Sequence, residues 1–290
     1  DATTLDALHT LGVGREYCGA PLPPLGVGMA PPGPVPDARD VDGPDGLGGQ
    51  RIAAELAAGR GRKARIPRKN AADLIATVLD QNAPRTVTLV ATGPMTNLAV
   101  LAERHPSSFA RARAVIAMGG SFFSAGNRDR AAEFNIFRDP ESASKVVAFC
   151  RQEATDNSAP LVPLTFVGLD VTHQVRLFRE EVASLERGPG AFVRGITGFY
   201  MDFYERNEGL PGCYLHDPLA LALVADPSLC EVEPFYVEIE TKGDHTSGAS
   251  IADHRPTRIF GSEALRVTHV CVAVDVERAR RIILERVLRD

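Results

Sequence analysis

Three short apolar runs constrain the fold of this chain more than any other feature. Each is rich in Val, Leu, Ile or Phe and lies close to a glycine, as buried strands often do. These runs cover residues 86–91, 114–118 and 161–169. Segments with helical spacing lie between and beside them, over residues 71–81, 95–110 and 141–152. Strands that alternate with helices in this way predict an α/β fold, with an open, mainly parallel sheet covered by helices on both faces.

The second half of the chain is expected to be more helical. Its expected helices cover residues 178–187, 191–207, 216–224 and 276–288, and its expected strands cover residues 235–241 and 267–275. Near the start, residues 3–11 have helical spacing, and residues 14–49 are rich in Gly and Pro, which indicates a long loop. No repeat divides the sequence, so we expect one domain over residues 1–290.

Composition narrows the partners of the chain. The net charge is −5, and no apolar stretch approaches the roughly 18 residues of a membrane-spanning helix. We therefore expect neither nucleic acid nor a membrane as a partner. The cysteines are odd in number and widely spaced, without a CxxC pair, which favours reduced thiols in the cytoplasm over a zinc site or a disulfide framework. They are Cys18, Cys150, Cys213, Cys230 and Cys271.

The segment from Ala114 to Asp139 is the first candidate for a binding site. Its apolar run ends at Met118 and a pair of glycines, and a polar loop with Asn127, Glu133 and Asn135 follows. Ligands of open α/β sheets bind beyond the carboxyl ends of the strands, and two amides with a carboxylate suit a molecule with vicinal hydroxyls such as ribose. The alternative is a polar loop whose side chains bond to its own backbone.

Four ordered motifs resemble the inosine–uridine nucleoside hydrolase family. They are Val90 to Asn97 (VATGPMTN), Met118 to Asn135 (MGG, then GN, then AEFN), Gly168 to His173 (GLDVTH) and His216 to Ala220 (HDPLA). The resemblance covers nearly the whole chain, and it implies a Rossmann-like α/β domain that hydrolyses ribonucleosides to ribose and a free base. It also implies a homo-oligomer.

The resemblance gives roles to individual residues. It implies that Asn127, Glu133 and Asn135 hold the ribose hydroxyls and that Met118 lies beneath the sugar. Phe134 and Tyr204 become candidate neighbours of the nucleobase, although either aromatic side chain could equally belong to the core. Because the sequence has no Trp on which a purine could stack, we expect a base-nonspecific or pyrimidine-preferring enzyme.

The resemblance also implies a calcium ion, with Thr92 as a main-chain ligand and Asp217 as a carboxylate ligand. Calcium prefers such oxygen ligands, and a metal-bound water would be the nucleophile. In the same family the histidine before that aspartate protonates the leaving base, and this residue is His216 here. Without the resemblance, Thr92 would simply close a strand, Asp217 would stabilise a helix start and His216 would be an ordinary histidine at a helix end.

The front of the chain departs from the family pattern. No DxDxGxDD cluster, which supplies most calcium ligands in the family, is present, and Asp1 and Asp6 lack its glycine turn and preceding strand. Residue Asp42 also stands where the family usually has a histidine. We therefore expect this sequence to be a truncated record of a longer enzyme, and we expect the 290-residue chain itself to bind calcium weakly.

Two other functions fit parts of the sequence. A non-catalytic homologue that binds ribosides, or that serves as a subunit of an active partner, would explain the missing aspartates. A dinucleotide-dependent oxidoreductase could have the same architecture, but no GxGxxG run follows the strand that ends at Gly119 and Gly120.

Overall fold

The computed structural model describes residues 24–31, 41, 43, 69–152, 161–183, 185–186, 188–255 and 268–287. The expected helix over residues 3–11 and most of the Gly- and Pro-rich segment lie outside these residues, as do Asp1, Asp6 and Asp42. No helix of the described ranges is long and apolar enough to cross a membrane.

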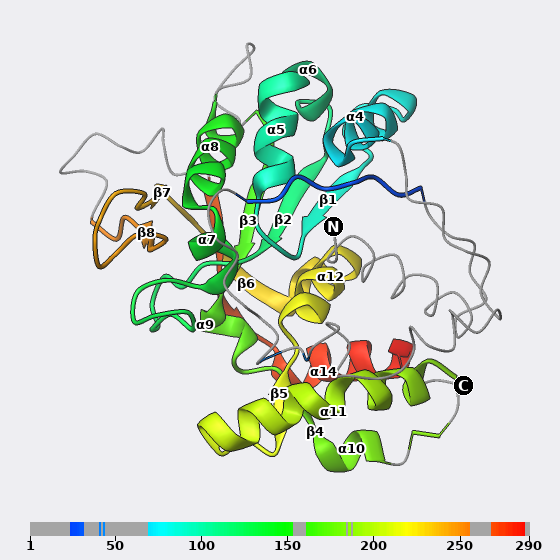
Figure 1. The fold of residues 1–290 in the computed structure, drawn as a ribbon. Helices are drawn as coiled ribbons and strands as arrows, with labels where there is room; N and C mark the ends of the chain where they lie inside the picture. The colour runs from blue at the N-terminus through cyan, green and yellow to red at the C-terminus, as the bar shows by residue number, and fades with distance from the viewer. Residues whose placement is uncertain are drawn as a thin grey trace.

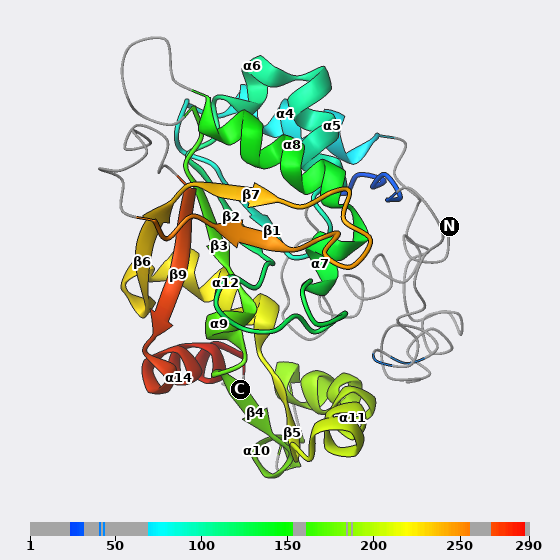
Figure 2. The same cartoon turned by 90° about the vertical axis from the view of Figure 1, so that its left-hand side faces the viewer.

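A five-stranded sheet forms the centre of the described structure, in the order β1-β2-β3-β9-β6 (Figures 1 and 2). The first four strands are parallel, and only β6 runs antiparallel to its neighbour β9. The strands are β1 (Thr88–Ala91), β2 (Ala114–Met118), β3 (Leu164–Val167), β6 (Cys230–Phe235) and β9 (Thr268–Val274). The expectation of an open, mainly parallel sheet is confirmed.

Alternate residues of β2 enter two different cores. Val115 and Ala117 pack with the helices of one layer, while Ile116 and Met118 pack with those of the other. Because both faces of the sheet are covered here, its central strands β1, β2 and β3 are mostly apolar. Figure 1 shows the first layer above the sheet and most of the second below it. The first layer contains α4 (Ala71–Gln81), α5 (Thr96–Arg104), α6 (Pro106–Phe109) and α8 (Pro140–Arg151).

The second layer holds the helices that follow β3. They are α9 (Leu169–Thr172), α10 (Arg179–Ala183), α11 (Gly188–Glu208), α12 (His216–Ala225) and α14 (Val276–Val287), with a 3₁₀ turn at Pro227–Leu229. Two small antiparallel sheets complete the described fold. One pairs β4 (Arg176–Phe178) with β5 (Gly212–Tyr214), and the other pairs β7 (Val237–Ile239) with β8 (Ser250–Ala252) and lies beside α8.

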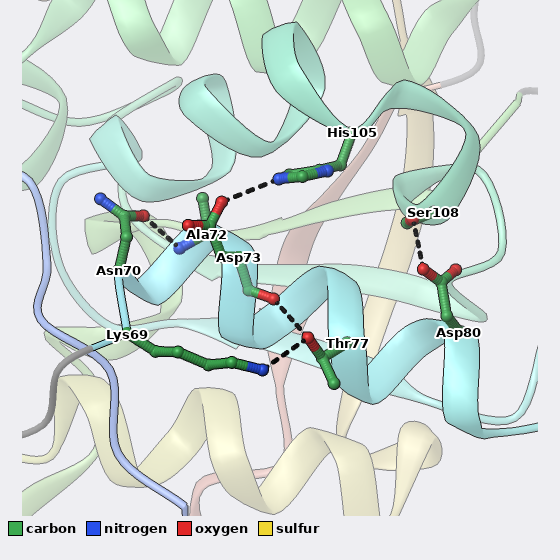
Figure 3. Close-up of polar contacts among 8 residues, drawn as sticks. All are labelled: Lys69, Asn70, Ala72, Asp73, Thr77, Asp80, His105 and Ser108. Carbon is green, nitrogen blue, oxygen red and sulfur yellow. Dashed lines mark hydrogen bonds and ion pairs between the residues drawn. The ribbon is translucent and has the colours of Figure 1, made fainter.

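Side chains at the ends of α4 fix this helix to its neighbours (Figure 3). Asn70 caps the helix, because its Oδ1 accepts from the Ala72 N–H at 2.8 Å. His105 contacts Asp73 at 2.9 Å, and the Ser108 hydroxyl donates to Asp80 at 3.0 Å, so α4 is joined to the α5–α6 corner. The expected helix over residues 71–81 is confirmed.

Several expected boundaries were wrong. The segment 95–110 is two helices, because Pro106 has no N–H to continue the first one. The apolar run to Leu169 contains a shorter strand, and Leu169 already begins α9. Residues 178–187 give the end of β4 and the short α10 rather than one helix.

The edge strand β6 was not expected at all. Four of its six residues are exposed, and it contains Pro234, so it lacks the continuous apolar pattern of the central strands. The expected strand over residues 235–241 is in fact β7, and Phe235 is the last residue of β6. Pairing with β9 across a bulge stabilises β6, which sequence pattern alone does not reveal.

Candidate active site

The carboxyl ends of β1, β2 and β3 lie together at one edge of the sheet. Ala91 is in register with Ala117, and Met118 is in register with Val167. The residues that follow each strand therefore gather at this edge, as the sequence predicts. Helix α9 begins directly after β3, and α12 packs against α9, β1 and β2 (Figure 1).

Glu133 is the central buried acid of the loop that follows β2. Its side chain is 2% exposed and caps α7 (Phe134–Arg138). Its Oε1 accepts from the Asn135 N–H at 2.8 Å, while its Oε2 accepts from the N–H groups of Ile136 at 3.0 Å and Gly120 at 3.1 Å. These three bonds fold the loop back onto the end of β2.

Burial dominates the electrostatics of Glu133. Loss of solvation raises the pKa of its carboxyl to about 7, although three backbone N–H donors act in the opposite direction. The negative charge of Asp217 adds a smaller upward contribution to this pKa. That effect requires the carboxylate at the start of α12 to lie near the loop after β2, so the two sequence motifs meet in space.

Two asparagines of this loop use one half of their amide groups for structure. The Asn135 Nδ2 donates to the Met118 carbonyl at 3.1 Å and contacts the Met118 sulfur at 3.2 Å. The Asn127 Oδ1 accepts from the Phe134 N–H at 2.9 Å. Within the described part of the chain, the side-chain oxygen of Asn135 (Oδ1) and the side-chain NH₂ of Asn127 have no partner. One acceptor and two donors therefore remain for a ligand.

His216 begins α12 on the opposite side of this edge. Its Nδ1 lies 2.7 Å from the Thr172 hydroxyl, and its Nε2 is buried without a hydrogen-bond partner among the described residues. Rings of His173 and Tyr214 flank it, with centroids 5.4 and 5.6 Å away. Burial and, to a smaller extent, nearby His173 lower the pKa of His216 to about 3, so the imidazole is neutral at pH 7. The resemblance implies a proton donor at this position, whereas this low pKa leaves the ring uncharged near neutral pH.

The two expected metal ligands are both accessible. Thr92 directly follows β1 and is exposed, and Asp217 is the exposed second residue of α12. Together they provide two kinds of oxygen, whereas calcium takes about six to eight oxygen ligands. No group of three or more His, Cys, Asp or Glu side chains suited to a metal occurs among the residues that the structure describes. These residues alone do not fit a calcium site.

The two expected base contacts differ in position. Phe134 is half-buried at the first position of α7, next to the amides described above. Tyr204 is 6% exposed, and its hydroxyl lies 3.1 Å from that of Tyr200. Its ring meets the Tyr214 ring at 4.9 Å, and Tyr214 in turn lies beside His216. Tyr204 is therefore one ring removed from the histidine, and its burial favours the core role that the sequence left open.

Sequence reasoning missed Thr172 and Gly120. A threonine inside a GLDVTH run has no distinctive signal, and 44 residues separate Thr172 from the histidine that it contacts. Gly120 has a φ of +85°, and its carbonyl accepts from the Leu169 N–H at 2.9 Å while its own N–H donates to Glu133. The glycine pair after β2 was a signal for a turn, but not for a residue that joins two loops.

Comparison with known proteins identifies similar chains. The sequence profile described as inosine-uridine preferring nucleoside hydrolase matches residues 1–281. The inosine-uridine preferring nucleoside hydrolase of Crithidia fasciculata is 32% identical over 86% of this chain and 73% of its own length. Uridine nucleosidase 1 of Arabidopsis thaliana is 31% identical over 84% of this chain and 68% of its own length.

Solved structures show the same fold. The plant nucleoside hydrolase PpNRh1 superposes with a TM-score of 0.83 and 26% identity, covering 100% of this chain and 86% of the other. A purine-preferring ribonucleoside hydrolase from Gardnerella vaginalis gives a TM-score of 0.81 and 27% identity, with 96% of this chain and 84% of the other covered.

Proposed function

This chain belongs to the inosine-uridine preferring nucleoside hydrolase family, and on that premise we propose that its site hydrolyses the N-glycosidic bond of ribonucleosides to give ribose and a free base. The observation that carries the proposal is the buried Nε2 of His216, which has no partner among the described residues and lies one residue before Asp217, whose charge acts on Glu133. The carboxylate and amides of the loop after β2 suit the hydroxyls of a sugar, and the imidazole at the start of α12 suits a departing base.

The sugar is held by the atoms that the fold leaves unused. The side-chain Oδ1 of Asn135 accepts from one ribose hydroxyl, and the side-chain NH₂ of Asn127 donates to another. An ionised Glu133 has roughly four acceptor positions, of which three are occupied by backbone N–H groups, so one remains. Because these groups recognise hydroxyls, a deoxynucleoside is a poor substrate. Met118 lies beneath the sugar.

The base departs toward His216. Cleavage of the bond places positive charge on the ribose and negative charge on the base. A neutral imidazole stabilises that negative charge by donating a hydrogen bond from Nε2, in the manner of a neutral histidine electrophile. Phe134 and the rings beside His216 would be the aromatic contacts of the base. The sequence has no Trp, so we propose a base-nonspecific or pyrimidine-preferring site.

Calcium is part of the proposal only through the resemblance. The Thr92 carbonyl and the Asp217 carboxylate would be two of its ligands, and the ion would supply an activated water when bound. Since the described residues do not complete such a site, no step above depends on it. Calorimetry tests this point: Asp217→Asn should weaken calcium binding, whereas an unchanged affinity removes Asp217 from the ligand set.

We further propose a cytoplasmic homo-oligomer. The four cysteines that the structure describes are free and buried, which fits a reducing compartment. Gel filtration with light scattering would test the oligomeric state, and a monomeric mass would contradict it.

A comparison of two substrates tests the role of His216. The base of inosine needs stabilisation of its negative charge as it leaves, whereas the leaving group of p-nitrophenyl riboside is an already stabilised phenolate. In a metal-replete form, His216→Ala should lower kcat/KM on inosine by roughly a hundredfold or more and keep most of the rate on the nitrophenyl riboside. The exposed His245→Ala is the matched control and should leave both rates unchanged. Equal losses on both substrates would show that His216 does not act on the leaving group.

A further inference from the structure

Thr172 has a buried hydroxyl with a single hydrogen-bond partner among the described residues. The residue is 0% exposed, and the only hydrogen bond that its Oγ1 makes among the described residues joins it to the His216 Nδ1 at 2.7 Å. Its backbone is already satisfied, because its N–H donates to the Gly168 carbonyl and its own carbonyl accepts from the Val175 N–H. The side chain is thus free to serve the histidine alone.

The turn that holds Thr172 is fixed at its start. The Leu169 N–H donates to the Gly120 carbonyl at 2.9 Å. Gly168 approaches the same carbonyl so closely that an added Cβ would lie 2.9 Å from it and 2.8 Å from the Asp170 carboxylate. Helix α9 therefore cannot shift easily relative to the end of β2, and the hydroxyl at its last residue has a fixed place.

The direction of the hydrogen bond follows from the hydroxyl proton. A buried O–H without an acceptor costs about 1–3 kcal/mol, and Nδ1 is the only acceptor within reach among the described residues. The hydroxyl therefore donates to Nδ1, which must then be unprotonated. In a neutral imidazole the remaining proton sits on the other nitrogen, so His216 carries its hydrogen on Nε2.

We propose that Thr172 is a positioning residue for the reaction: its hydroxyl selects the Nε2–H tautomer of His216 and aims that N–H at the leaving base. The proposal rests on the hydrolytic function proposed above. A hydroxyl performs this task without adding a charge beside the ring, whereas a carboxylate would favour the imidazolium form.

Two variants separate positioning from packing. Thr172→Val keeps the shape and removes the hydroxyl, and Thr172→Ser keeps the hydroxyl and removes a methyl group. Positioning predicts that Thr172→Val lowers kcat on inosine roughly tenfold to thirtyfold with little change in KM or in the rate on p-nitrophenyl riboside. Thr172→Ser should stay within about threefold of the native rate. A packing role predicts the opposite order, with Ser the worse substitution and both substrates affected equally, and that result would overturn the proposal.

Two further measurements keep the test decisive. In a His216→Ala background, Thr172→Val should have no additional effect, because the hydroxyl acts through the ring. Proton–nitrogen NMR of the histidine rings reports the tautomer without any turnover: the native His216 should be protonated at Nε2, and Thr172→Val should give a mixture. A native ring protonated at Nδ1 would overturn the proposal. Failure of the native protein to hydrolyse either substrate would instead contradict the proposed function and leave the tautomer result to stand alone.

Discussion

The two sides of the candidate site differ in how completely their polar atoms are satisfied. On the loop after β2, Glu133 accepts three backbone N–H groups, and both asparagines use half of their amides to hold the backbone. On the α12 side, one hydroxyl holds His216 and its Nε2 has no described partner. The first side is prearranged by the fold, whereas the second keeps a nitrogen without a partner among the described residues, which a ligand would supply under the proposed function.

This difference assigns different chemistry to the two sides. A group that builds its own loop cannot be altered without altering the loop, so substitutions there should reduce both stability and turnover. A group with an unused nitrogen contributes to the reaction but little to folding. Four experiments can break or sharpen this distinction.

The largest effect is expected from Glu133→Gln. The Gln NH₂ would face backbone N–H donors that now bond to a carboxylate oxygen, so we expect a loss of stability of about 3 kcal/mol and a fall in kcat/KM of roughly a thousandfold. Urea unfolding measures the loss of stability, and kinetics on inosine measure the fall in kcat/KM. Asp129→Asn is the matched control, because this exposed carboxylate also accepts two backbone N–H groups, from Ala131 and Ala132. A stable but inactive Glu133→Gln would contradict the link between the two roles.

The stability should also depend on pH through Glu133. Its pKa is about 7 in the folded protein against 4.5 for a free glutamate side chain, so the folded state holds the proton more tightly than the unfolded chain. The associated stability is fully present below about pH 4.5 and is lost as the pH rises through 7, by about 3 kcal/mol in total. Unfolding free energies measured across this pH range check the prediction. Glu133→Gln is the reference, because its side chain does not titrate. A stability that rises between pH 5 and 7 in the native protein alone would show that the N–H donors outweigh burial.

Asn135→Ala should lower turnover on inosine or uridine by roughly a hundredfold, because it removes an acceptor whose bond to the ribose strengthens in the transition state. The Met118 carbonyl would also lose its donor, so a modest loss of stability of about 1 kcal/mol accompanies it. Circular dichroism confirms the fold. Asn207→Ala, which removes an amide from the exposed side of α11, is the control. Near-native kinetics for Asn135→Ala would remove this loop from the sugar site.

The smallest effect on turnover is expected from Gly120→Ala. Its φ of +85° is unfavourable for alanine, and the new Cβ would lie 2.7 Å from the Phe122 ring, so we expect a loss of about 2 kcal/mol. Gly209→Ala has a similar φ of +67° in open space and isolates the backbone contribution. Because Gly120 joins both sides, turnover on inosine and on p-nitrophenyl riboside should fall by the same factor. A selective loss on inosine would show that only the α12 side depends on it.

The sequence predicted the sheet edge better than it predicted the contacts there. The runs ending at Ala91 and Met118 are apolar because both faces of the sheet are buried, and parallel strands bring their ends together. Edge strand β6 was missed because its exposed residues and Pro234 leave no such pattern. The Thr172 contact was missed because it depends on how α9 and α12 pack, and a low pKa for His216 follows from burial that no local motif encodes.

The double role of the Gly120 peptide has a consequence for the divergence of such chains. Its N–H donates to Glu133 in the loop after β2 and its carbonyl accepts from Leu169 of α9, so one backbone residue contacts both sides. If the proposed roles hold, substitutions of the aromatic residues around α11 and β5 would change which base is accepted and leave the proposed ribose contacts in place. The same arrangement makes Gly120 intolerant of substitution, because a change of this one residue would disturb the loop after β2 and α9 together.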